Sequence, residues 1–224
     1  MIDISSIDLF IFDFDGTIID STSFWFHASS LYLKYKNINV DFDIDKDVTW
    51  FYCEENFKRI LSYYKLYDDN DNLLNPKNMK EDVLKFIDTT YQNLPYNEGI
   101  IDFIKYLKNN NKEIIILSSS PKRIIDLSLK NHNVTNLFDD VISLDDLNLS
   151  KHDGSGYKYF LENYHIDINK SIYLDDTYEA IIEAVKHNIK TIVIKDPYNE
   201  YKKEELFKLT NTYIDTKDLN KIFR

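Results

Sequence analysis

The sequence predicts an α/β protein: a Rossmann-like, doubly wound parallel sheet core with an inserted, mostly helical cap domain. Two observations carry this prediction. Short apolar runs rich in Ile and Val alternate with helical patterns from residue 99 to about 195, and residues 20–95 contain no convincing strand pattern. Alternating strands and helices are typical of a parallel sheet covered by helices on both faces.

Five apolar runs predict the strands of the core. Polar residues do not alternate within them, which is typical of strands buried on both faces. The runs lie at residues 7–15, 113–120, 140–144, 171–176 and 191–196. Near the end of the chain we expect a minor edge strand at 211–214 and a closing helix at 217–223.

The segments between these runs show the spacing of amphipathic helices. Apolar side chains recur at positions i, i+3, i+4 and i+7, which places them on one face of a helix. One set is Ile100, Phe103, Ile104 and Leu107, and a second is Tyr157, Phe160, Leu161 and Tyr164. These helices are expected to cover the sheet.

The segment between the first two strands predicts a separate helical domain. Helical patterns cover residues 21–36, 52–66 and 78–92, with loops expected at 68–78 and 93–99. The predicted division is therefore a core of residues 1–19 and 96–224 and a cap of residues 20–95.

Composition limits the classes of partner and the compartment. The chain has 38 acidic and 27 basic residues and a net charge of −11, which argues against nucleic acid or an anionic membrane surface as a partner. The single cysteine, Cys53, excludes an internal disulfide and favours a reducing compartment; we expect it to be a small apolar group on a helix face. No targeting segment or long apolar run is evident, so we expect a cytoplasmic protein. The sequence does not indicate an oligomeric state.

Polar residues stand where the predicted strands end. In an open parallel sheet, ligands bind beyond the carboxyl ends of the strands, so these side chains are expected to meet at one edge. They are Asp13 and Asp15 after the first strand, Ser118 after the second, Lys151 after the third, and Asp175 with Asp176 after the fourth.

Four carboxylates and one ammonium cannot share a pocket without a further cation. Carboxylates a few ångströms apart raise one another's pKa, which opposes ionisation. Mg²⁺ removes this conflict, because it prefers a few carboxylates completed by water and a substrate phosphate. The sequence therefore predicts a Mg²⁺ site at this edge of the sheet.

These residues resemble a known family. The motif "DFDGT" at 13–17, Ser118, Lys151 and "DD" at 175–176 are similar to the four ordered motifs of the haloacid dehalogenase superfamily of phosphotransferases. The resemblance covers residues 1–19 and 96 to about 195. The helical insertion matches, in position and length, the cap of the first structural subgroup of that family.

The resemblance implies a role for each motif residue. Asp13 would be the nucleophile that forms an aspartyl-phosphate, and Asp15 would protonate the leaving alcohol and then deprotonate water. The metal ligands would be Asp13, Asp176, Asp175 and the backbone carbonyl of Asp15. The phosphate-binding groups would be Ser118, Ser119, Lys151 and the backbone around Gly16.

Three functions are compatible with these motifs. The first is a Mg²⁺-dependent phosphatase acting on a small phosphorylated metabolite, and the second is a sugar-phosphate mutase of the β-phosphoglucomutase type. Those mutases have a histidine where this chain has Trp25. The third is a non-catalytic phosphate- or metal-binding regulator. Dehalogenation is disfavoured because that branch lacks the second aspartate, which is Asp15 here.

The cap sequence does not identify the substrate. His27 could face the pocket or lie packed or solvated. Lys58 and Arg59 could grip an anionic substrate or lie on a solvated helix face.

Overall fold

The chain folds into two compact units. The computed structural model describes residues 1–40, 43–48, 53–164 and 166–223. The first unit, here called the core unit, comprises Met1–Asp20 and Leu94–Arg224, and the second, the cap unit, comprises Ser21–Asn93. The predicted boundaries lie one residue away at the first crossing and two residues away at the second. Within the described residues, no helix is long and apolar enough to span a membrane.

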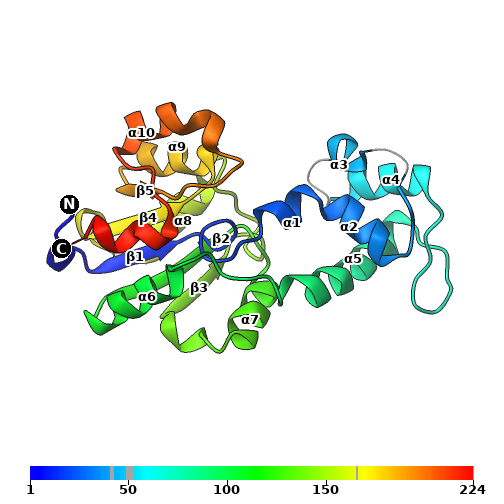
Figure 1. Ribbon diagram of the computed structural model, residues 1–224, viewed down its shortest axis with the longest axis horizontal. Coiled ribbons are helices and arrows are strands. Elements are labelled where there is room, and N and C mark those ends of the chain that lie inside the picture. The colour runs from blue at the N-terminus through cyan, green and yellow to red at the C-terminus, as the bar shows by residue number, and fades with distance from the viewer. Residues whose placement is uncertain (41–42, 49–52, 165, 224) are drawn as a thin grey trace. The chain divides into compact units, whose positions relative to one another are not determined.

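A five-stranded parallel sheet forms the centre of the core unit (Figure 1). The strand order is β3-β2-β1-β4-β5. The strands are β1 (Leu9–Phe12), β2 (Glu113–Ser118), β3 (Asp140–Ser143), β4 (Ser171–Asp175) and β5 (Thr191–Val193). The predicted α/β fold is confirmed. All five strands end before the predicted carboxyl ends; after β1, β2 and β4, the polar residues that follow belong to the site described below.

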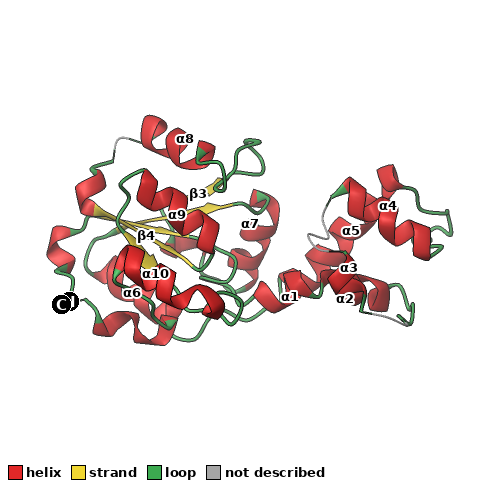
Figure 2. Cartoon of the chain, turned by 90° about the horizontal axis from the view of Figure 1, so that it is seen from above, coloured by secondary structure: helices red, strands yellow, loops and turns green. Residues whose placement is uncertain are grey.

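Helices cover both faces of the sheet, and Figure 2 shows α6 (Ile100–Asn109) and α8 (Ser155–Asn163) on opposite sides of it. Leu9 and Ile11 of β1 lie in one apolar cluster with residues of α8 and α9 (Tyr178–Lys186). The Phe10 ring contacts Phe103 of α6 and Phe223 on the other face. Because both faces are buried, the strands have no polar alternation.

Two helices of the core unit begin one residue later than their sequences suggest. Ser120 and Asp176 are typical N-cap residues, but α7 (Lys122–Asn131) is capped at Pro121 and α9 at Thr177. The two side chains are engaged elsewhere: the Ser120 hydroxyl donates to Asp15, and Asp176 accepts from Thr17.

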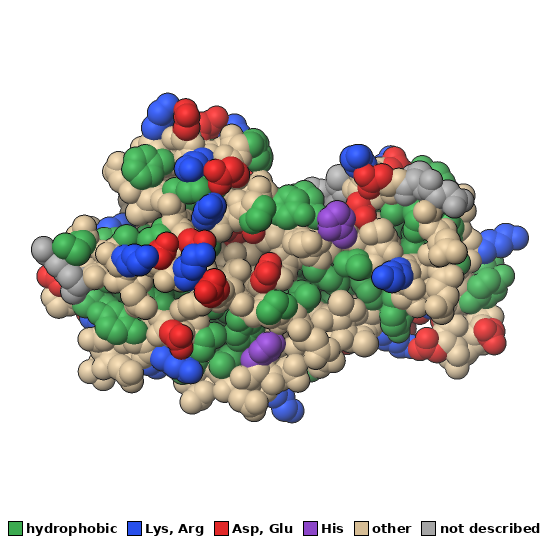
Figure 3. Space-filling view, viewed as in Figure 1, with side chains coloured by type: hydrophobic (Ala, Val, Ile, Leu, Met, Phe, Trp, Pro, Cys, Tyr) green, Lys and Arg blue, Asp and Glu red, His purple; other side chains and the backbone are tan. Residues whose placement is uncertain are grey.

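The last part of the chain lies against β5. The predicted edge strand at 211–214 is reduced to one parallel bridge between Ile194 and Ile214, and the predicted closing helix is a 3-10 helix at Thr216–Lys221. The sequence analysis did not predict α10 (Lys203–Thr210), whose one buried residue, Leu206, gives a weak apolar pattern. Acidic and basic side chains are interspersed around this helix (Figure 3).

The described part of the cap unit is helical. Its helices are α1 (Thr22–Phe26), α2 (Ala28–Tyr35), α3 (Ile44–Asp47), α4 (Glu54–Tyr63) and α5 (Pro76–Tyr91). The predicted helix 21–36 is wrong as one element, because the chain breaks at His27, where no glycine or proline signals it. The predicted helix 52–66 corresponds to α4, and its first residue lies outside the described residues.

The start of α5 lies two residues before the predicted one. Asn75 caps the helix and forms a reciprocal capping box with Asn78, while Pro76 occupies the first helical position. An Asn-Pro pair is a recognised helix start, so the sequence contained this signal.

The expectation that Cys53 is an apolar group on a helix face is wrong. Cys53 is exposed and lies at the N-cap of α4.

A buried polar network joins α2 to α5 inside the cap unit. The Tyr32 hydroxyl donates to Asp82 over 2.6 Å, and the Lys36 ammonium lies 3.1 Å from the same carboxylate. Tyr32 is fully buried, and the side chains of Lys36 and Asp82 are only 11% and 4% exposed. Asp82 therefore supplies a buried acceptor to two polar groups at once.

We expect Asp82→Ala to lower the free energy of unfolding of the cap unit by about 3 kcal/mol, because Tyr32 and Lys36 then lose their buried partner. Both tryptophans of the chain, Trp25 and Trp50, fall within the sequence of the cap unit. Urea unfolding followed by tryptophan fluorescence therefore reports on this unit.

The matched control is Asp69→Ala. Asp69 lies before α5 and pairs with Lys85 of that helix. Both side chains are more than half exposed, so the unfolding midpoint should not change. Equal midpoint shifts for Asp82→Ala and Asp69→Ala would contradict the assignment of the buried network.

Candidate active site

Three buried carboxylates meet at the carboxyl ends of β1 and β4. Asp13, Asp175 and Asp176 each offer a carboxylate oxygen, and these oxygens lie within 4.8 Å of one another. Asp13 follows β1 directly, and its N–H donates to Leu174 of β4 over 2.8 Å. This backbone bond continues the ladder between the two strands and brings the adjacent acids together.

Lys151 places one positive charge against this cluster. Its ammonium lies 2.6 Å from an Asp13 oxygen and 2.8 Å from an Asp175 oxygen, and its side chain is 4% exposed. The residue lies in the loop between β3 and α8. A lysine that sequence alone cannot distinguish from a solvated one is therefore a buried member of the site.

The Asp175 carboxylate is held by the chain at both oxygens. Oδ2 accepts from the Lys151 ammonium and from the Tyr173 hydroxyl, and Oδ1 accepts from the Thr177 N–H. Donors from the chain thus occupy Asp175, which makes it better suited to orient Lys151 than to bind an ion with both oxygens.

The loop after β1 carries Gly16 against the Asp176 carboxylate. Gly16 has a φ of +72°, and a Cβ at this position would lie 2.3 Å from Oδ2 of Asp176. The Thr17 hydroxyl donates to Oδ1 of Asp176 over 3.0 Å. Only glycine fits this approach, because both the left-handed backbone and the contact distance exclude a side chain.

The end of β2 supplies three serines to the same edge of the sheet. Ser118 is buried and accepts the Ser120 N–H over 3.0 Å, while Ser119 is exposed. The Ser120 hydroxyl donates to Oδ2 of Asp15 over 2.5 Å. The Asp15 side chain is thereby held by the loop after β2 and does not belong to the three-carboxylate cluster.

Sequence reasoning missed several residues that shape the site. The Asn97 side chain donates to the carbonyls of Gly16 (2.8 Å) and Thr17 (3.1 Å), and so fixes the loop after β1. The Tyr173 hydroxyl bonds to Asp175 from within β4. An asparagine in a loop and a tyrosine in an apolar strand have ordinary structural explanations, so no sequence signal separated these residues from others of their type.

Burial and mutual repulsion oppose ionisation of the cluster. Burial raises the pKa of Asp13 to about 8; Lys151 opposes this rise, and Asp175 and Asp15 add to it. Burial, followed by the charges of Asp175 and Asp13, raises the pKa of Asp176 well above its usual range. Without a further cation, the cluster therefore holds protons at neutral pH.

The chemistry of this donor set fits a hard divalent cation. The ligands available are carboxylate oxygens, which Mg²⁺ prefers, and Lys151 offsets only one of the three negative charges. A bound divalent cation would restore the charge balance and favour ionisation of Asp13 and Asp176. Asp13 and Asp176 are the residues best placed to hold it, with the backbone carbonyl of Asp15 as a third candidate.

The cap residues singled out from the sequence lie on polar surfaces of the cap unit. The exposed His27 ring lies 3.4 Å from Asp45. Lys58 pairs with Glu54 and is 60% exposed, and the Arg59 guanidinium donates to the Asp47 carbonyl. These contacts match the solvated alternative for Lys58 and Arg59.

Comparison with known proteins identifies the family. The haloacid dehalogenase-like hydrolases match residues 10–194, which is more than half of the chain. The chain belongs to this family. The expected family is thus confirmed, and the protein is a hydrolase of this type. A search of curated protein sequences finds no match.

Solved structures share the fold over nearly the whole chain. A candidate β-phosphoglucomutase from Thermotoga maritima has a TM-score of 0.78 and 17% identity, covering 96% of this chain and 100% of its own. CbbY from Rhodobacter sphaeroides, in a mutant form bound to xylulose-(1,5)-bisphosphate, has a TM-score of 0.72 and 14% identity; the match covers 95% of this chain and 96% of CbbY. The HAD-hydrolase YfnB from Bacillus subtilis, described as bound to magnesium, has a TM-score of 0.68 and 16% identity; the match covers 92% of this chain and 99% of YfnB. Identities this low show the fold alone.

We expect Gly16→Ala to weaken Mg²⁺ binding, because the added methyl group would displace the Asp176 carboxylate. Isothermal titration calorimetry with Mg²⁺ measures this directly. Gly99→Ala is the matched control: Gly99 has a φ of +78°, and its Cβ would lie 2.7 Å from Cα of Lys217. The control should lose stability and keep its Mg²⁺ affinity. Equal affinity in the two variants would contradict the role given to Gly16.

We expect Mg²⁺ affinity to rise with pH up to about 8, by about tenfold per pH unit for each proton released. The direction follows from Asp13: with its pKa raised to about 8, this carboxyl carries a proton at pH 6 that must leave before it binds a cation. Calorimetry in two buffers with different heats of ionisation counts the protons released. Affinity that is independent of pH, with no proton released, would contradict this account of the cluster.

Proposed function

We propose that this protein is a Mg²⁺-dependent phosphatase that hydrolyses a small phosphomonoester through an aspartyl-phosphate on Asp13. One observation carries the proposal: Asp13 stands in a buried cluster of three carboxylates with a lysine, while the Asp15 carboxylate is held separately by Ser120. The two aspartates of the loop thus have different surroundings. Different surroundings allow one carboxylate to act as nucleophile and the other as acid and base.

In the first step, an oxygen of Asp13 attacks the phosphorus atom and the bond to the leaving oxygen breaks. Asp15 donates its proton to that oxygen, so the product leaves as a neutral alcohol. The hydrogen bond from Ser120 holds the Asp15 carboxylate apart from the three-carboxylate cluster. The Gly16 N–H donates to the Ile19 carbonyl over 2.9 Å, so we assign the binding of the phosphoryl oxygens to Ser118 and Lys151.

In the second step, a water molecule attacks the phosphorus atom of the aspartyl-phosphate. Asp15, now ionised, takes a proton from that water, and the bond between phosphorus and Asp13 breaks. Phosphate leaves, and both aspartates return to their first state. The proton that Asp15 lost in the first step is thereby restored.

Charge neutralisation falls to Lys151 and to the cation. When bound, Mg²⁺ would offset the charge of the phosphoryl oxygens and of the aspartates. Lys151, which already contacts Asp13 and Asp175, would also be within reach of a phosphoryl group carried by Asp13. Asp13 and Asp176 would hold the cation directly.

Composition supports a small-molecule substrate and a reducing location. The net charge of −11 supports a phosphorylated metabolite over nucleic acid as the partner, and the single cysteine is in keeping with a cytoplasmic location.

We expect Mg²⁺-dependent hydrolysis of p-nitrophenyl phosphate by the wild type, and loss of that activity to background in Asp13→Asn and Asp15→Asn. The matched control is Asp8→Asn at the other end of β1, an exposed aspartate paired with Lys170, which should keep full activity. All variants should show the same thermal midpoint within a few degrees, so that loss of activity is not loss of folding.

Two other outcomes would decide for the alternative functions. Isomerisation of a sugar phosphate faster than phosphate release would identify a mutase. Absence of any Mg²⁺-dependent turnover across a panel of phosphorylated metabolites would leave a non-catalytic binding protein.

A further inference from the structure

Asn199, beyond the end of β5, connects the core of the sheet to one of the acids of the site. Its side-chain amide group donates to the carbonyl of Asp176 over 2.7 Å and to that of Ile194 over 2.9 Å. Its carbonyl oxygen accepts from the Asp196 N–H over 3.2 Å and from the Tyr213 hydroxyl over 2.7 Å. The residue is 4% exposed. Its two donor hydrogens and its oxygen are all used.

These partners fix the orientation of the amide. Two backbone carbonyls face one end of the side chain, and carbonyls can pair only with the NH₂ group. An N–H and an O–H face the other end, where only an oxygen can accept. The reverse orientation would set oxygen against two carbonyl oxygens, so the arrangement has a single solution.

Asn199 links the segment after β5 to the residue that follows β4. The Ile194 N–H, directly after β5, donates to the carbonyl of Asp175 in β4 over 2.9 Å. After Asp196 the chain turns, and Pro197 has no N–H to offer. The Asp176 carbonyl, directly after β4, accepts instead from the side chain of Asn199.

We propose that Asn199 is a positioning residue that fixes the backbone of Asp176 so that its carboxylate meets the cation. The Asp176 carbonyl is held by Asn199, and the Asp176 carboxylate is held by Thr17 against Gly16. An aspartate that is held both at its backbone carbonyl and at one carboxylate oxygen loses less conformational freedom when it binds a metal. Groups that orient a metal ligand commonly change metal affinity almost as much as the ligand itself.

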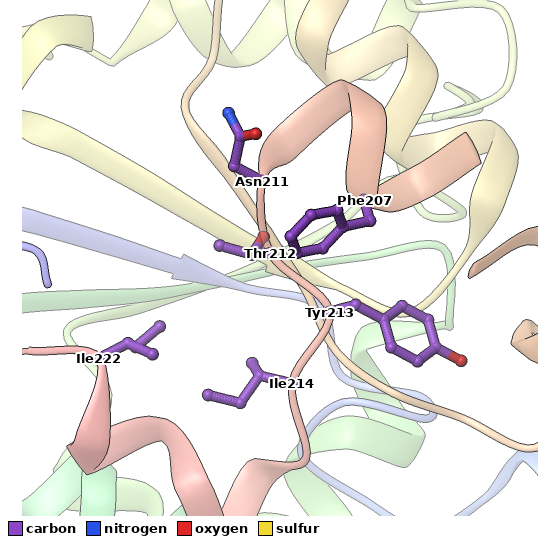
Figure 4. A pocket seen from close by; sticks show the side chains of 6 residues that line it. All are labelled: Phe207, Asn211, Thr212, Tyr213, Ile214 and Ile222. Carbon is purple, nitrogen blue, oxygen red and sulfur yellow. The ribbon is translucent and has the colours of Figure 1, made fainter. Parts of the chain in front are cut away.

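Tyr213 extends this link to the last segment of the core unit. Figure 4 shows the Tyr213 side chain on the opposite side of the segment from Thr212 and Ile214, whose side chains point the other way. Its one hydroxyl hydrogen is shared between the Asn199 oxygen, 2.7 Å away, and the Glu200 carboxylate, 2.9 Å away. The segment that pairs with β5 through Ile214 thus also supports the oxygen of Asn199.

The apolar groove beside this segment carries no inference of its own. Phe207, Tyr213, Ile214 and Ile222 line it, with a volume of about 210 Å³ (Figure 4). Nothing in the structure shows what would cover it.

The inference rests on the proposed Mg²⁺ site, and its test measures metal affinity as well as activity. Asn199→Ala and Asn199→Asp should weaken Mg²⁺ binding roughly 10- to 100-fold by calorimetry. Activity should recover in part at saturating Mg²⁺, so that the Mg²⁺ concentration for half activity changes more than kcat does. Tyr213→Phe removes one of the two donors to Asn199 and should weaken binding in the same direction but less.

The matched control is Ser171→Ala at the opposite end of β4. The Ser171 hydroxyl donates to the Asp167 carbonyl over 2.8 Å, and Ser171 is 1% exposed, so its loss destabilises the sheet without touching the site. The control should lower the thermal midpoint in EDTA and keep the wild-type Mg²⁺ affinity. Should Asn199→Ala behave like Ser171→Ala, with a lower midpoint and unchanged affinity, Asn199 is structural and the inference fails.

Failure of the proposed function gives a different result. A wild type that does not bind Mg²⁺ would overturn both the function and the inference. A wild type that binds Mg²⁺, loses binding in Asp176→Asn and keeps it in Asn199→Ala and Tyr213→Phe would overturn the inference alone.

Discussion

The negative charge buried at the carboxyl ends of β1 and β4 is the constraint on which the rest of this structure depends. Parallel pairing of two apolar strands brings Asp13 beside Asp175 and Asp176, out of reach of bulk water. Carboxylates in such surroundings are unstable as ions unless cations or hydrogen-bond donors compensate for them. Lys151, Thr17 and Tyr173 are arranged around the acids to provide part of that compensation. The part that remains is the physical basis for a cation.

The same constraint explains why neighbouring residues have so little freedom. Glycine is the one residue type that fits at position 16 beside the Asp176 carboxylate, and Asn97 holds the loop that contains Gly16. Asn199 meets the backbone of Asp176 from the other side. The site is therefore supported by loops after β1 and β5 and by the loop that brings Lys151, so its geometry depends on the whole sheet. An enzyme that must align a nucleophile with a phosphorus atom gains from such rigidity.

The sequence predicted the sheet and the charged members of the site because both leave a clear pattern. Apolar runs mark the buried strands, and Asp13, Ser118 and Asp175 stand where those runs end. Lys151 became interpretable only through its spacing relative to the other motifs. Asn97, Ser120 and Asn199 could not be predicted, because polar residues in loops form turns and caps far more often than they support a site.

The errors in the helical part have a similar cause. The break between α1 and α2 at His27 has no glycine or proline to mark it, and α10 buries too few apolar residues for a clear period. The start of α5 was marked by Asn75 and Pro76 but lay inside a polar segment that resembles a loop.

The central claim is that Asp13 accepts the phosphoryl group beside a cation held by the acids of this cluster. Acid-quenched mass spectrometry during turnover of an aryl phosphate with Mg²⁺ tests it most directly. The account predicts one phosphoryl adduct on the peptide that contains Asp13, absent when Mg²⁺ is withheld. Steady turnover with no adduct on that peptide at any quench time, or with the adduct on another residue, would contradict it.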